Sequence, residues 1–107
     1  MDTAQVNRAG KAIIEALNSH VYGCKNTEAL REITKLADDA LYAADFNGYV
    51  SERAGSIKHY AGVLYSERKH AALAQDNQTG AERVRQFILN DASVLANWLP
   101  FSTPPKE

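Results

Sequence analysis

The chain has little that would commit it to one kind of chemistry. Its single cysteine, Cys24, cannot form a disulfide within the chain. The 12 basic and 13 acidic residues are interspersed and nearly cancel, so no field of one sign steers the protein towards nucleic acid. Apolar runs are far shorter than the roughly 20 residues of a membrane span. We therefore expect no membrane association and disfavour a nucleic-acid partner.

Recognisable catalytic motifs are missing as well. The sequence has no Gly-x-Ser-x-Gly elbow, no glycine-rich phosphate loop and no paired cysteine motif. We accordingly predict a protein that is not an enzyme and that needs no cofactor or metal. The first residues lack the basic region and apolar segment of a secretory signal, which makes a cytoplasmic location the default expectation.

The apolar residues that are present have the spacing of helices. They recur at steps of three and four, the pattern of a helix with one buried side. The pattern predicts one all-α domain over 1–107, with helices at 3–22, 27–46, 50–74 and 80–99 and a C-terminal tail at 100–107. Connections this short force successive helices to run antiparallel, so we predict an up-and-down four-helix bundle.

The same spacing identifies the residues that should point inward. The predicted core consists of Val6, Gly10, Ile13, Leu17, Leu30, Ile33, Ala37, Ala40, Ala44, Val50, Ala54, Ile57, Ala61, Leu64, Ala81, Val84, Ile88, Leu95 and Leu99, with Phe87 and Trp98 beside it. Asn47-Gly48 is predicted to turn the chain between two helices, because both residues tolerate positive φ. Thr79-x-x-Glu82 matches a capping box, which predicts the start of the last helix.

Two glycines stand out in the third predicted helix. Gly55 and Gly62 lie seven residues apart and hence on one side of 50–74. Each costs roughly 1 kcal/mol relative to alanine in a helix interior. Three interpretations stay open: a break in this helix, close approach of a neighbouring helix in the same bundle, or a seam between two copies. The last would make the protein a homo-oligomer.

The polar side of the second predicted helix is the first candidate for binding a partner. Tyr42 lies there, away from the predicted core, together with Arg31, Lys35 and Asp45. Tyrosine suits an interface because its ring is large and stiff and carries a polar edge. We therefore expect this side to contact another protein, with Tyr42 as its first contact residue.

Further contact candidates lie in the third helix and at the C-terminal end. His59, Ser66 and His70 return to nearly the same side of a helix, at offsets of seven and eleven. The two histidines would stand about 16 Å apart along the axis, too far to share a metal ion. Trp98 and Phe101 either close one end of the bundle or dock onto a second chain.

One residue pair resembles a known family. Arg53 and His59 have the Arg-x5-His spacing of the HEPN helical ribonucleases, although Ala54 stands where that family usually has a polar residue. The resemblance covers these two residues and implies that they would be catalytic. Residues six positions apart in one helix are rotated by about 240° about its axis, so their side chains diverge unless the helix breaks at Gly55.

The favoured hypothesis is a small non-enzymatic protein that binds a larger protein partner and associates with itself. Phage and mobile-element inhibitors of bacterial complexes include many small bundles, which is an analogy of architecture alone. Two alternatives stay open. One is a bundle that binds a nucleotide-like anion through tyrosines and basic residues, and the other is a HEPN-like ribonuclease.

Overall fold

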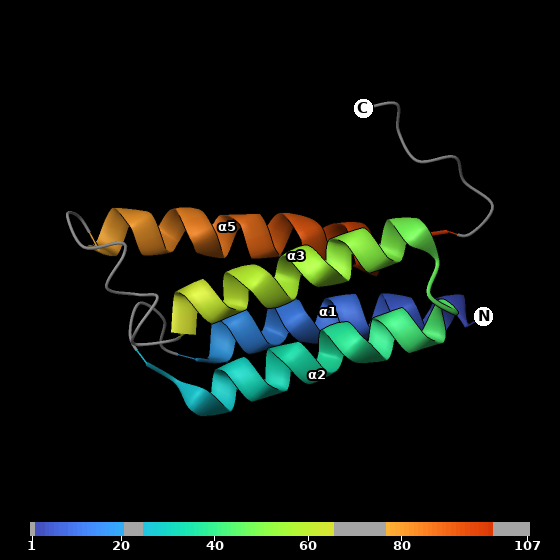
Figure 1. The fold of residues 1–107 in the computed structure, drawn as a ribbon, viewed down its shortest axis with the longest axis horizontal. Helices are drawn as coiled ribbons and strands as arrows, with labels where there is room; N and C mark the ends of the chain where they lie inside the picture. The colour runs from blue at the N-terminus through green and yellow to red at the C-terminus, as the bar shows by residue number, and fades with distance from the viewer. Residues whose placement is uncertain (1, 21–24, 66–76, 100–107) are drawn as a thin grey trace.

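The residues that the structure describes form an antiparallel bundle of four α-helices (Figure 1). The structure is a computed structural model that describes residues 2–20, 25–65 and 77–99. The helices are α1 (Thr3–Ser19), α2 (Thr27–Ala43), α3 (Gly48–Tyr65) and α5 (Asn77–Ala96). In cross-section they form a ring in which α1 packs on α2, α2 on α3, α3 on α5 and α5 on α1. The predicted all-α up-and-down bundle is confirmed.

The core lies where the predicted inward positions meet. All but two of those positions within the described residues are buried, the exceptions being Leu30, which is half-buried, and Leu99, which is exposed. Many of the buried residues are small: Ala9, Ala16, Ala29, Ala37, Ala40, Ala44, Ala54, Ala61, Ala81, Ala92 and Ala96. Small side chains let helix axes approach closely, so the interior depends on backbone proximity as much as on interlocking large side chains.

The closest approach joins the first helix to the last. A Cβ atom built on Gly10 of α1 would lie 2.4 Å from the backbone N of Ala96 and 2.7 Å from the carbonyl O of Ala92, both on α5. These are backbone atoms of a packed helix, so they cannot move aside as a flexible side chain could. Gly10, which the spacing predicts to point inward, thus makes a contact with α5 that only glycine allows.

The connection between α2 and α3 differs from the predicted Asn47-Gly48 turn. The positive φ values belong to Asp45 (54°) and Phe46 (59°) instead. Asn47 caps α3, because its side-chain oxygen accepts from the amides of Tyr49 (2.9 Å) and Val50 (3.2 Å). Gly48 is the first residue of α3, which begins two residues earlier than predicted, while α2 ends three residues earlier.

The last helix is also displaced from its predicted range of 80–99. It already includes Thr79 near its start, so Thr79 is not the N-cap that the capping-box match predicted. It ends at Ala96, in keeping with Pro100, which disfavours helical conformation in the residue before it. The side-chain amide of Asn7 on α1 then donates to the carbonyl of Leu95 (2.9 Å), which also accepts from the amide of Trp98 (3.3 Å), and to the carbonyl of Trp98 (3.1 Å).

The third helix is continuous through Gly55. α3 runs without interruption from Gly48 to Tyr65, so the break considered at Gly55 does not occur, and residues 66–74 lie outside the described residues. The interpretation that Gly55 admits a neighbouring helix of the bundle is wrong. Gly55 is exposed, and a Cβ atom there would meet nothing within 4 Å.

Gly10 and Gly55 make a matched pair for a test of the α1–α5 contact. We expect Gly10→Ala to lower the free energy of unfolding by about 1–3 kcal/mol, because the methyl group must push α5 away. Gly55→Ala should raise it by up to about 1 kcal/mol, since alanine favours the helix and open space receives the methyl. Urea unfolding followed by circular dichroism measures both. Equal effects of the two substitutions would contradict the close approach.

Candidate functional site

The outer side of α2 carries the residues that the sequence nominated for binding. Arg31, Lys35 and Tyr42 are exposed and lie close to one line along α2, and Asp45 is exposed just beyond its end. Lys35 Nζ is 3.2 Å from Asp39 Oδ2, one turn further along, in an exposed pair. The structure therefore places the predicted contact residues side by side on an accessible surface.

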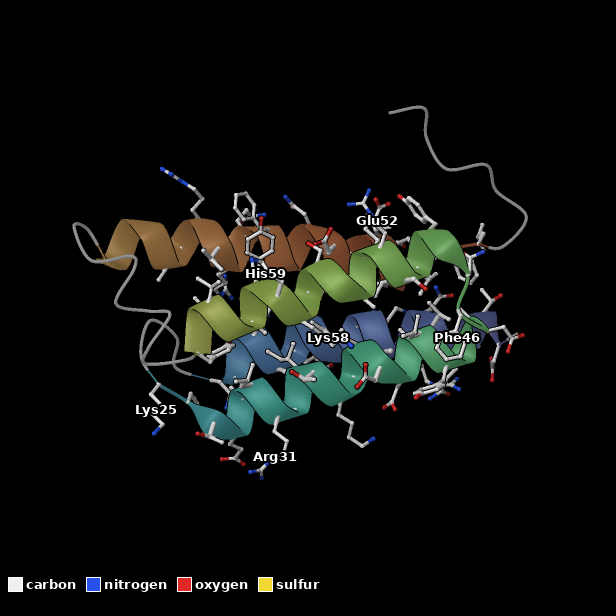
Figure 2. All side chains as sticks on the ribbon, viewed as in Figure 1. Lys25, Arg31, Phe46, Glu52, Lys58 and His59 are labelled. Carbon is white, nitrogen blue, oxygen red and sulfur yellow. The ribbon has the colours of Figure 1, made fainter. Side chains whose placement is uncertain are left out.

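Among the described residues, the two most exposed large aromatic side chains lie at the C-terminal end of this line. Tyr42 is 66% exposed and Phe46 is 58% exposed. Their ring centroids are 5.1 Å apart at an interplanar angle of 81°, an edge-to-face contact that holds each ring against the other rather than against the core. Figure 2 shows Phe46 at the end of the bundle where α2 passes into α3, with Arg31 further along the outer side of α2. We call Tyr42 and Phe46 the aromatic tip.

The backbone that ends α2 positions the aromatic tip. The amide of Asp45 donates to the carbonyl of Tyr42 (3.1 Å), and the amide of Phe46 donates to that of Leu41 (3.0 Å). This pair of hydrogen bonds is the Schellman arrangement, in which the residue after the C-cap takes the left-handed conformation. Glycine usually fills that place, yet here two residues with side chains, Asp45 and Phe46, have positive φ.

Holding Phe46 in this conformation is costly. A residue other than glycine in the left-handed region costs roughly 1–2 kcal/mol, because its Cβ atom crowds the following carbonyl. Strain of this kind concentrates at functional sites, where the surrounding structure compensates for it. At Phe46 the bundle keeps a strained backbone and leaves the ring in solvent, which makes the aromatic tip the leading candidate for a contact site.

Arg53 and His59, the pair that resembles the HEPN spacing, are not brought together. Arg53 points across to α5, where its Nη1 donates to Asp91 Oδ1 (2.9 Å), and its guanidinium carbon lies 5.1 Å from the centroid of the Tyr49 ring. The hydrogen bond that Arg53 donates to Asp91 raises the pKa of Arg53 against the opposing effect of burial. His59 is exposed six positions further along an unbroken helix.

The remaining candidate residues are either at least partly exposed on α3 or outside the described residues. His59 and Gly55 are exposed on α3, and Gly62 is half-buried. Ser66, His70 and Phe101 lie outside the described residues.

The expectation for Leu99 is wrong, whereas Trp98 takes the first of its two predicted roles. Trp98 is 7% exposed and belongs to the core, so it seals the bundle rather than offering a ring to a second chain, whereas Leu99, predicted inside, is 55% exposed. The reason is geometric, because α5 ends at Ala96 and the helical phase that assigned the two residues no longer applies beyond it.

Three further residues have positions that the sequence pattern does not predict, two at the surface and one buried. Phe46 was placed inside a helix, and its exposure follows from the helix ending early. Phe87, placed beside the core, is 39% exposed and lies against Tyr60. Asp91 is a carboxylate buried to 6% exposure, and its place on the α3 side of α5 was the signal that could have paired it with Arg53.

Comparison of the chain with models of known protein families, with curated proteins and with solved structures found no match. In 2–20, 25–65 and 77–99, no helix has the length and apolar character to cross a membrane. Over the same residues, no three His, Cys, Asp or Glu side chains gather where they could hold a metal ion.

The Arg53–Asp91 pair should hold α3 to α5. We expect Asp91→Ala to lower the free energy of unfolding by about 2 kcal/mol, because the guanidinium loses a charged hydrogen-bond partner in a partly buried setting. The more exposed pair between Lys58 Nζ and Asp38 Oδ1, at 2.8 Å, provides the control. Asp38→Ala should cost less than about 1 kcal/mol. Equal losses in urea unfolding would contradict a special role for Asp91.

Proposed function

We propose that this protein is a non-enzymatic docking protein that binds a larger protein partner through the aromatic tip. The observation that carries the proposal is the pair of neighbouring aromatic rings, Tyr42 and Phe46, which both lie in solvent, with Phe46 on a strained backbone. Binding would bury both rings at once. Burial of the two rings together favours a partner with an apolar pocket that accommodates both of them.

The neighbouring side chains suit the rim of such an interface. Arg31 and Lys35 extend from the aromatic tip along α2, and Asp45 stands between the two rings in the sequence. Charged residues at a rim set orientation and association rate more than affinity. Acting in this way, the protein would cover or bridge its partner, as small inhibitor bundles of phages and mobile elements do.

The partner can be sought with a photo-cross-linking amino acid at position 42. In lysate of the source cells, the probe at Tyr42 should capture one protein that a probe at Lys11, exposed on α1, does not capture. Mass spectrometry identifies the captured chain, which is then purified for titration. If positions 42 and 11 capture the same proteins, the proposal fails.

A glycine at position 46 should separate stability from binding. Phe46→Gly removes the strain of a left-handed phenylalanine, so we expect the free energy of unfolding to rise by about 1 kcal/mol. The same change removes half of the aromatic tip. It should raise the dissociation constant for the identified partner at least tenfold, which corresponds to about 1.4 kcal/mol. Urea unfolding and calorimetric titration measure the two effects, with Lys11→Ala as the control. Unchanged affinity would show that Phe46 is not a contact residue.

A further inference from the structure

A second surface, formed by α3 and α5, differs from the outer sides of α1 and α2 in its low charge. Arg53 and Asp91, which lie between the two helices, pair with each other and are half-buried and buried, respectively. The residues of this surface share the outward side where the two helices meet: Ser56, His59, Val63, Phe87, Asn90 and Val94. We call this set the α3/α5 face. The outer sides of α1 and α2 carry charges throughout, such as Arg8, Lys11 and Glu15 on α1. Charge depletion marks the centre of protein interfaces more reliably than hydrophobicity does.

Aromatic rings cross the middle of the α3/α5 face. The Tyr60 ring, half-buried in the seam between the helices, lies 5.1 Å from Phe87 on α5 and 4.9 Å from His59 on α3, measured between centroids. His59 is exposed, and Phe87 is 39% exposed. The three rings therefore form a continuous ridge with an accessible outer edge.

Gly55 lies beside this ridge, four residues before His59, and is exposed. A Cβ atom on Gly55 would meet nothing within 4 Å, and its φ is not positive. Neither packing nor backbone conformation inside the monomer calls for glycine, which costs about 1 kcal/mol relative to alanine. A backbone without a Cβ atom does allow a ridge on another molecule to come close.

Two charges flank the α3/α5 face at opposite ends. Glu52 lies one turn before Ser56 on α3, and Arg83 lies one turn before Phe87 on α5. Because the two helices run antiparallel, these turns fall at opposite ends of the face. Neither residue forms an ion pair within the part of the chain that the structure describes. Figure 2 shows Glu52 and His59 on the side of α3 that borders α5.

We propose that the α3/α5 face binds a second copy of this chain around a two-fold axis close to His59. A two-fold rotation about the middle of the face exchanges its ends, so Glu52 of each copy meets Arg83 of the other, and the uncharged centres meet each other. The arrangement of charges is thus complementary to itself, which favours a second copy over an unrelated partner. The predicted self-association is thereby assigned to the α3/α5 face, with Gly55 at its edge, and is independent of the aromatic tip.

Charge reversal at the two flanking residues tests this dimer. Light scattering and sedimentation should find the wild-type chain as a dimer. Glu52→Arg alone sets Arg against Arg83, and Arg83→Glu alone sets Glu against Glu52, so each should raise the dimer dissociation constant roughly tenfold or more. The two variants mixed in equal amounts should form a heterodimer, because both interchain pairs are then opposite in charge.

The mixture separates direct pairing from damage to the fold. Circular dichroism should show unchanged helix content for both variants, and Lys35→Glu on α2 serves as a charge reversal off the face that leaves the dimer intact. A wild-type chain that stays monomeric at millimolar concentration overturns the proposal. A mixture of the two reversed variants that stays monomeric overturns it equally, as does loss of the dimer in Lys35→Glu. The Phe46→Gly variant should remain dimeric, which keeps this outcome separate from partner binding.

Discussion

Contact between α1 and α5 at Gly10 closes the bundle, and the rest of the structure depends on that closure. The Cβ position of Gly10 lies 2.4 Å from the backbone of Ala96, so the two helices touch through main-chain atoms. The alanines that line the interior extend the same principle to the other pairs of helices. Dispersion forces act over short distances, and the packing energy of such an interior comes from many close contacts. The large residues that remain, including Ile13, Ile57 and Ile88, are completely buried between these approaches.

A rigid frame of this kind explains how the surface can carry strained and exposed groups. The left-handed residues at the end of α2 are unfavourable locally, yet the flanking helices fix both sides of the connection. The aromatic tip and the α3/α5 face lie on different parts of this frame, one at an end and one along a side.

Periodicity predicted the frame because burial is a property of position along a helix. Ile33, Ile57 and Ile88 were assigned inward from spacing alone and are fully buried. The exposed residues are harder to predict, because exposure at a helix end depends on where the helical hydrogen bonding stops. The Schellman bonds place Phe46 outside, and the early end of α5 leaves Leu99 exposed, although its spacing predicts it inside. Tyr42 was placed correctly, since it lies within a regular turn of α2. Contacts between distant segments, such as Gly10 with Ala96 or Arg53 with Asp91, have no local signature.

The hydrogen bonds that the Asn7 side chain donates to the carbonyls of Leu95 and Trp98 affect the order in which the bundle assembles. They join residues separated by 88 and 91 positions, so nothing made early in translation can complete them. While α5 is still to be synthesised, α1, α2 and α3 can pair through their short connections, but Gly10 has no partner on α5 and stays open to water. The contact with α5 is a long-range step, and such steps are slow compared with the formation of local hairpins. Closure of the bundle therefore has to wait for the last helix to be made.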